Sequence, residues 1–175
     1  PEYLPYGGTI VCEKELIKRQ LLRMRADLEV FSLAEMAIRQ NRDIEAIEDQ
    51  PAKELELLET LRVNGEIDGY VISRGKFSQI RTRVRRHTLG MQREKPTQEF
   101  ERSTFISPPL EGFTVLVSRS GFPNSVISKI NDTAAETCYQ IENSIYEALS
   151  DDLKHVSGIF VEQKKLSTIL KQYVK

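Results

Sequence analysis

The residues best suited to chemistry in this sequence form a basic run between positions 74 and 95. Eight basic side chains face the single acid Glu94 there: Arg74, Lys76, Arg81, Arg83, Arg85, Arg86, Arg93 and Lys95. Guanidinium groups bind phosphates through paired hydrogen bonds, and exposed aromatic rings stack on bases. We therefore expect a binding site for nucleic acid or a protein partner at Arg74, Lys76, Arg81, Arg83, Arg85 and Arg86. Tyr70 and Phe77 are the candidate stacking residues.

A block of acidic residues precedes this basic run. Between Asp43 and Glu59 there are seven carboxylates and one lysine, Lys53. Such a segment repels phosphates, so a nucleic acid would meet the basic run through its backbone rather than its base edges. An acidic protein is an alternative partner. A third interpretation is that the two blocks neutralise each other, because runs of charge are usually solvated or self-paired.

Residues for catalysis and metal binding are sparse. His87 and His155 are far apart in sequence, and no histidine or cysteine pair has metal-ligand spacing. The segment SRSG, Ser118 to Gly121, lacks the first glycine of a nucleophile elbow. The sequence predicts no catalytic residue, no metal site and no cofactor, and it favours binding over catalysis. The acid pair Asp151-Asp152 leaves acid-base chemistry open, since only a cleft would decide its role.

The composition indicates a folded protein. Of 175 residues, 39% are hydrophobic and 29% are charged. The formal net charge of -1 provides no global attraction to nucleic acid or membranes, so a charged partner requires a local patch. No apolar run reaches the roughly 18 residues of a membrane span. Cys12 and Cys138 predict small buried thiols, with one bridge between them as the alternative, and buried thiols favour an intracellular location.

Apolar spacing predicts a helical first third. Side chains recur in steps of three and four at Ile17, Leu21, Met24, Leu28 and Phe31. Ser32, with Glu35 three residues later, predicts a capping box that opens a second helix. Pro51 is suited to the first turn of a third helix, and Asn64-Gly65 to its end. The segment from Tyr70 to Ile80 then predicts two strands around a tight turn at Arg74-Gly75.

The second half has a different pattern. FTVLVS and, before it, STFIS predict short strands, and Ser125–Leu149 predicts one continuous amphipathic helix. Its apolar stripe predicts packing on a protein partner or a second copy; the alternative is that FTVLVS and a terminal helix over Glu162–Tyr173 cover it. We predict a helix-rich α+β protein with a winged-helix-like region (1–88), a linker or mobile loop (89–102) and an α/β region (103–175).

The order of helix, capped helix, helix and hairpin from about Lys14 to Arg83 resembles a winged-helix domain. SLAEMA resembles its second helix, and LLETLRVNGEIDGYVISRGKF resembles its third helix running into the wing. This resemblance implies a nucleic-acid reader. The acidic third helix disfavours major-groove recognition, so the wing would provide the phosphate contacts.

Two further segments resemble the second lobe of type II periplasmic solute-binding proteins. These are LRVNGEIDGYVIS and SPPLEGFTVLVSRSGFPNSVISKIND. The resemblance implies a periplasmic α/β lobe that binds a ligand without catalysis, with Asp68, Ser118 and Arg119 as ligand contacts. The two functional hypotheses are therefore a binding protein with a basic hairpin and, as the alternative, a ligand-binding lobe of a transport or sensor protein.

Overall fold

The computed structural model describes residues 4–41, 50–79, 86–89 and 105–167. The chain divides into two compact units, Pro1–Leu89 and Gly90–Lys175. Both helices and strands are present, so the broad α+β assignment is confirmed.

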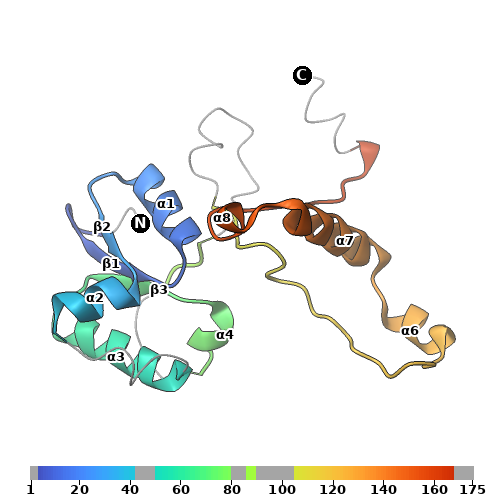
Figure 1. Ribbon diagram of the computed structural model, residues 1–175, viewed down its shortest axis with the longest axis horizontal. Helices are drawn as coiled ribbons and strands as arrows, with labels where there is room; N and C mark the ends of the chain where they lie inside the picture. The colour runs from blue at the N-terminus through green and yellow to red at the C-terminus, as the bar shows by residue number, and fades with distance from the viewer. Residues whose placement is uncertain (1–3, 42–49, 80–85, 90–104, 168–175) are drawn as a thin grey trace. The chain divides into compact units, whose positions relative to one another are not determined.

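The first unit contains a three-stranded parallel sheet. Its strands are β1 (Thr9–Cys12), β2 (Glu29–Phe31) and β3 (Gly69–Val71), in the spatial order β2-β1-β3. β1 lies in the middle and is hydrogen-bonded to both neighbours (Figure 1). All three strands run in the same direction, so their carboxyl ends lie at one edge of the sheet, which we call the carboxyl edge.

Helices connect the strands across both faces of this sheet. α1 (Glu15–Met24) joins β1 to β2, whereas α2 (Leu33–Arg39) and α3 (Pro51–Val63) lie between β2 and β3. The second connection passes back over β1, and right-handed crossovers in opposite directions place helices on opposite faces. Figure 1 shows this arrangement, with α1 on one side of the sheet and α2 and α3 on the other.

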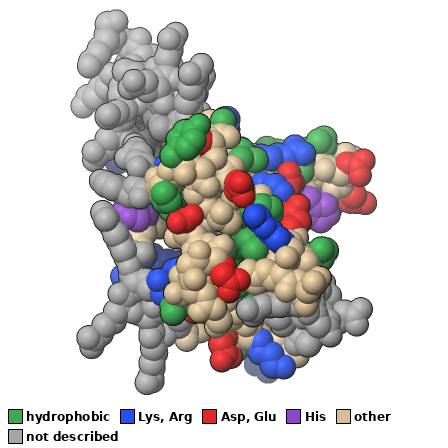
Figure 2. All heavy atoms as spheres, turned by 90° about the vertical axis from the view of Figure 1, so that its left-hand side faces the viewer, with side chains coloured by type: hydrophobic (Ala, Val, Ile, Leu, Met, Phe, Trp, Pro, Cys, Tyr) green, Lys and Arg blue, Asp and Glu red, His purple; other side chains and the backbone are tan. Residues whose placement is uncertain are grey.

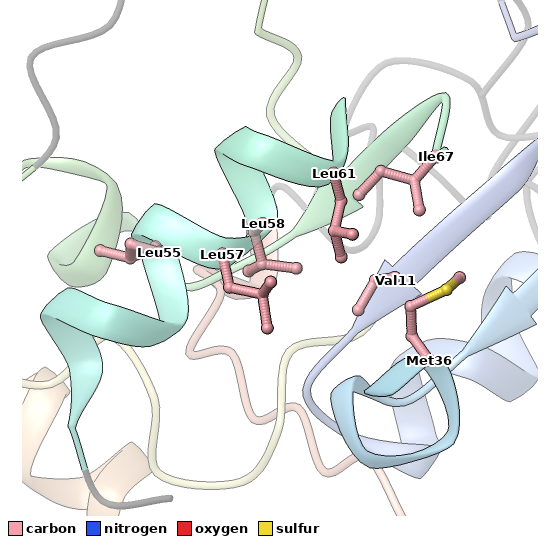
Figure 3. Packing of buried hydrophobic residues seen from close by; sticks show 7 residues of the cluster. All are labelled: Val11, Met36, Leu55, Leu57, Leu58, Leu61 and Ile67. Carbon is pink, nitrogen blue, oxygen red and sulfur yellow. The ribbon is translucent and has the colours of Figure 1, made fainter. Parts of the chain in front are cut away.

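The main core lies between the sheet and the α2–α3 face. Its buried members come from α3, α2, β1 and the loop before β3: Val11, Met36, Leu55, Leu57, Leu58, Leu61 and Ile67. In Figure 3, Leu57 and Leu61 of α3 point toward Val11 and Met36. Side chains alternate along a strand, so Ile10 and Cys12 face the other side, where Leu16, Ile17 and Leu21 of α1 are buried.

Two of the predicted helices begin where the sequence indicates, and one of them also ends there. Ser32 caps α2 with the full capping box, in which its hydroxyl accepts from the Glu35 amide and Glu35 accepts from the Ser32 amide. Pro51 occupies the first turn of α3. Gly65 has a φ of 73°, the left-handed conformation that favours glycine after a helix. These predictions are confirmed because helix caps depend on contacts between residues only a few positions apart.

The prediction of a long first helix is wrong at the carboxyl end of that helix. Helix α1 stops at Met24, and Leu28 and Phe31 belong to the turn before β2 and to β2 itself. β1, with the sequence TIVC, was not predicted at all. Three of its four residues are apolar, and it follows Gly7-Gly8. A short apolar run after a turn is typical of a buried parallel strand.

The winged-helix interpretation is also wrong. A wing is an antiparallel hairpin, whereas β3 pairs in parallel with β1. The residues expected to form the tight turn and second strand instead begin a short helix, α4 (Arg74–Phe77), whose first turn is capped by the Ser73 hydroxyl accepting from the Lys76 amide. The described residues contain no hairpin after β3.

The described part of the second unit consists of helices joined by segments without regular structure. It contains α6 (Asn124–Ile130), α7 (Thr133–Ala148) and α8 (Asp151–Lys154). The predicted continuous helix over Ser125–Leu149 is wrong because Asp132 interrupts it. The Asp132 carboxylate accepts hydrogen bonds from the amides of Ala134 and Ala135, which starts a new helix.

Extended segments accompany these helices. Buried Glu142 of α7 accepts hydrogen bonds from the Leu110 amide (3.0 Å) and the Val161 amide (3.3 Å), so one carboxylate holds two segments. The segments STFIS and FTVLVS, predicted as strands, have neither strand nor helix structure over their described residues, 105–107 and 113–118. The predicted terminal helix over Glu162–Tyr173 is not helical over 162–165, but residues 166–167 are helical, and its residues from 168 onward lie outside the described part of the chain.

Candidate ligand-binding edge of the sheet

The carboxyl edge gathers the polar residues that directly follow the strands. Glu13 follows β1, Ser32 follows β2, and Ser73 lies two residues after β3. Each of these positions leads into a helix, so α1, α2 and α4 all begin near this edge. Helix amino termini carry partial positive charge and unpaired amide groups, which adds to the polarity of the edge.

Three charged side chains meet there. The Lys76 Nζ lies 2.9 Å from Glu13 Oε1 and 2.8 Å from Glu54 Oε2. Glu13 comes from the β1–α1 connection, Glu54 from the first turn of α3, and Lys76 from α4. We call these residues the Glu13–Lys76–Glu54 cluster. The cluster joins the segments after β1 and β3 to the first turn of α3, which packs on the sheet.

The cluster is only partly open to solvent. The exposed fractions of the Lys76 and Glu13 side chains are 26% and 19%, and that of Glu54 is 18%. Burial by itself would lower the pKa of Lys76, but the hydrogen bonds to Glu54 and Glu13 raise it above its usual value. The ammonium therefore stays charged at neutral pH, and the cluster carries one net negative charge.

A second ion pair lies along the same edge. The Lys18 Nζ of α1 is 3.0 Å from both carboxylate oxygens of Glu35, the capping-box residue of α2. The amide of Ser32 and then Lys18 lower the pKa of Glu35 through hydrogen bonds. This pair is more open than the first, since 48% of the Glu35 side chain is exposed. Positive and negative groups therefore alternate along the edge.

Cys12 ends β1 beneath these charges. Its thiol is buried, and burial raises its pKa to about 11. A thiol with that pKa remains protonated at neutral pH, and the thiolate is the reactive form. Cys12 therefore serves as an apolar core residue and not as a nucleophile.

The order of the strands also makes this edge a candidate ligand-binding site. The chain leaves β1 toward β2 and then returns to the other side of β1, so its direction reverses between β1 and β3. In open α/β sheets, ligands bind outside the carboxyl ends of the strands at such a reversal. Glu13 and Lys76 follow the two strands that flank it, so their charges lie where this topology places a ligand.

The structure describes three of the six residues of the predicted basic site, and these three have different surroundings. Arg74 is exposed at the start of α4, and Lys76 is held by two carboxylates. Arg86 is exposed, with its guanidinium carbon 5.2 Å from the ring centroid of Phe77. The other three members, Arg81, Arg83 and Arg85, lie outside the described residues. The Lys76–Glu54 contact pairs one member of the basic run with one of the acidic block.

Acidic and basic side chains are also interspersed more widely. On the face of the molecule that Figure 2 shows, the described Lys and Arg side chains alternate with Asp and Glu, without a block of one sign. Glu59 of the acidic block contacts Arg62 at 2.7 Å, which lowers the pKa of Glu59. Local pairing thus accounts for several of the charges that the sequence presents as separate runs.

The two candidate stacking residues already have partners. Tyr70 is part of the core packing, and its hydroxyl donates a hydrogen bond to Glu59. Burial and this hydrogen bond raise the pKa of Tyr70. Phe77 is half-buried, and Arg86 lies over its ring. Both side chains therefore already make contacts within the first unit.

Residues implied by the solute-binding resemblance lie elsewhere. Asp68 is exposed at the opposite edge of the sheet, where its carboxylate accepts a hydrogen bond from the Thr9 amide (2.8 Å) and its own amide donates to the Thr9 carbonyl. It thereby fixes the amino end of β1 beside that of β3. Ser118 and Arg119 are exposed and belong to the second unit.

The sequence interpretation missed Glu13, Glu54, Lys18 and Glu35 as parts of one edge. A signal was present, because a charged residue directly after a short apolar strand is typical of a ligand-binding edge in α/β folds. It could be used only after TIVC had been recognised as a strand, and the pairing of Lys76 with Glu13 across 63 positions leaves no trace in local spacing.

Several other features of the described residues bear on function. They bring together no group of three or more His, Cys, Asp or Glu side chains that could hold a metal ion. None of their helices has both the length and the apolar character needed to cross a membrane. No protein-family model, curated protein or solved structure matches the chain.

Proposed function

We propose that this chain is a non-catalytic binding protein whose first unit holds a small polar solute at the carboxyl ends of β1 and β3. The observation that carries the proposal is the Glu13–Lys76–Glu54 cluster at the reversal of strand order. It agrees with the resemblance of LRVNGEIDGYVIS to solute-binding proteins, although the proposed contacts are Glu13 and Lys76 and not Asp68.

The charges of the edge favour a particular class of ligand. An ammonium group has three donors, and two of those of Lys76 face Glu13 and Glu54, which leaves one for a ligand carboxylate. The remaining oxygens of Glu13 and Glu54 can accept from a ligand ammonium. A solute that carries both a cationic and an anionic group therefore suits the cluster better than a polyanion does.

The basic-run hypothesis has less support from the same residues. A phosphate backbone requires cations that are not already neutralised. Lys76 is held by two carboxylates, and Arg74 and Arg86 are the described basic-run members that remain exposed. Binding of nucleic acid is therefore the alternative outcome of the experiment below.

The experiment is a thermal-shift screen followed by calorimetry on the full chain. The panel contains small zwitterions, monocarboxylates, monoamines and uncharged sugars. We expect a zwitterion to raise the unfolding temperature. We expect Glu13→Gln to weaken its binding about tenfold, which corresponds to about 1.4 kcal/mol, because the amide loses one charge contact.

A matched control is available at the opposite edge of the sheet. Asp68→Asn also converts a carboxylate into an amide, and the new amide oxygen can still accept from the Thr9 amide. We expect Asp68→Asn to bind the solute as the wild type does. Equal losses in both variants, or no binding by any member of the panel, would contradict the proposed site. Binding of labelled single-stranded DNA that weakens with salt would favour the basic run instead.

A further inference from the structure

A second feature concerns residues 113–119 of the second unit, which form an extended segment between two turns. Gly112 and Gly121, on either side of it, have φ values of 98° and 78°, so both turns use left-handed backbone. The exposed fractions of its apolar side chains are high, at 60% for Val115, 61% for Leu116 and 88% for Val117.

The amide and carbonyl groups of this segment are also free to pair with another strand. No backbone hydrogen bond joins residues 113–118 to any other described residue. β-branched residues favour strands, and an extended apolar segment with free amide and carbonyl groups is a template for pairing with another strand. The Phe113 ring makes an edge contact with Tyr139 of α7, 5.5 Å between centroids, which holds the start of the segment against a helix.

The order of its residues indicates what the segment pairs with. The sequence Thr114-Val115-Leu116-Val117-Ser118 reads nearly the same in both directions about Leu116. An antiparallel pair of two copies centred on Leu116 places Val115 opposite Val117 and Thr114 opposite Ser118. Paired β-branched residues and paired hydroxyl residues are both favourable across strands. A two-fold axis requires such a self-complementary surface.

We propose that residues 114–118 pair antiparallel with the same segment of a second copy of this chain, with the two-fold axis at Leu116. The rest of the second unit supports a partner of this kind. Its described residues include only two buried hydrophobic side chains, Phe105 and Cys138, while Ile130 is 68% exposed and both Ile141 and Ile145 are 44% exposed. Dimerisation would bury apolar side chains of 114–118 that the described residues of the unit leave exposed.

Site-specific disulfide formation tests both the pairing and its register. Opposed residues of antiparallel strands have Cα atoms about 4.5–5.5 Å apart, which lies within the range that a disulfide spans. Leu116→Cys places the two new thiols opposite each other at the axis. Val115→Cys places them two residues out of register, about 8 Å apart at a rise of about 3.4 Å per residue, which is too far.

We expect mild oxidation to convert Leu116→Cys to a covalent dimer at least ten times faster than Val115→Cys. A mixture of Val115→Cys and Val117→Cys chains should cross-link to each other, because those positions are opposed. The wild type provides the background, since Cys12 and Cys138 are both buried.

Sedimentation velocity at high protein concentration provides the second measurement. An isolated pair of strands is only marginally stable, so we expect a weak, concentration-dependent dimer. Leu116→Lys should abolish it by opposing two like charges at the axis, whereas Val63→Lys, at an exposed apolar position of α3 in the first unit, should dimerise as the wild type does. Equal cross-linking of Leu116→Cys and Val115→Cys, or a wild-type monomer without cross-linking, would overturn the proposal.

Discussion

At the scale of single residues, Asp27 is a carboxylate whose pKa is lowered strongly by its hydrogen bonds. Arg25 donates hydrogen bonds to both of its oxygens, and the Gly7 amide donates a third at 3.0 Å. These bonds, with that of Arg25 the largest contribution, lower the pKa of Asp27 to about 2. Arg25 also donates to the carbonyls of Leu4 and Pro5, so the pair fastens the segment before β1.

This arrangement predicts a specific dependence of stability on acid. A carboxylate whose pKa is lower in the folded state stabilises the fold above its unfolded pKa, near 4, and loses that contribution as the pH falls toward 2. We expect Asp27→Asn to have a lower unfolding temperature than the wild type at pH 7. The difference should shrink between pH 4 and pH 2, as followed by circular dichroism. A difference that stays constant over this range would contradict an ionic role for Asp27.

At the scale of elements, α2 shows how a short helix is fixed by its first turn. It spans seven residues, which is too short for a helix to be stable in isolation. The capping box of Ser32 and Glu35 satisfies amide groups at its start, and Lys18 of α1 holds Glu35 in place. Met36 and Ala37 then bury the helix against the sheet.

We expect Ser32→Ala to lower the free energy of unfolding by about 1 kcal/mol, because the Glu35 amide loses its acceptor. Urea denaturation measures this change. Ser144→Ala is the matched control, because the Ser144 hydroxyl donates to the Gln140 carbonyl within α7, an interaction that does not stabilise a helix. A control variant as destabilised as Ser32→Ala would show that loss of a serine, and not loss of the cap, is responsible.

At the scale of the whole molecule, burial differs between the two units. The α2–α3 face of the first unit contains most of the fully buried large side chains, and Leu61, exposed by only 1%, lies among them (Figure 3). The described part of the second unit exposes many apolar residues of α6 and α7. The fold of the first unit therefore depends on its own core, whereas the described part of the second unit buries few apolar side chains.

The core makes a quantitative prediction. We expect Leu61→Ala to reduce the free energy of unfolding by about 2–5 kcal/mol, because it removes buried methyl groups and leaves a cavity. Leu166→Ala, at a position that is 69% exposed, should change it by less than about 0.5 kcal/mol. Chemical denaturation monitored by circular dichroism compares the two. A small effect of Leu61→Ala would show that the cluster in Figure 3 is not closely packed.

The sequence by itself determined the features that depend on short-range contacts. Ser32 with Glu35 predicts the start of α2, and Pro51 with Gly65 predicts both ends of α3, because capping and backbone conformation involve only residues a few positions apart. The mixture of helices and strands, the two free buried cysteines and the charge blocks also follow from residue types and their spacing.

Only the tertiary structure decided how the strands pair and which charges meet. Gly69–Val71 can pair in a hairpin or beside β1. The choice depends on β1, 57 residues earlier, whose short sequence TIVC has no periodicity of its own. Lys76 belongs to a basic run in the sequence but to an ion-pair cluster in the fold, because strand order brings Glu13 and Glu54 to it. Contacts over such separations are set by packing of the whole unit, which local spacing does not encode.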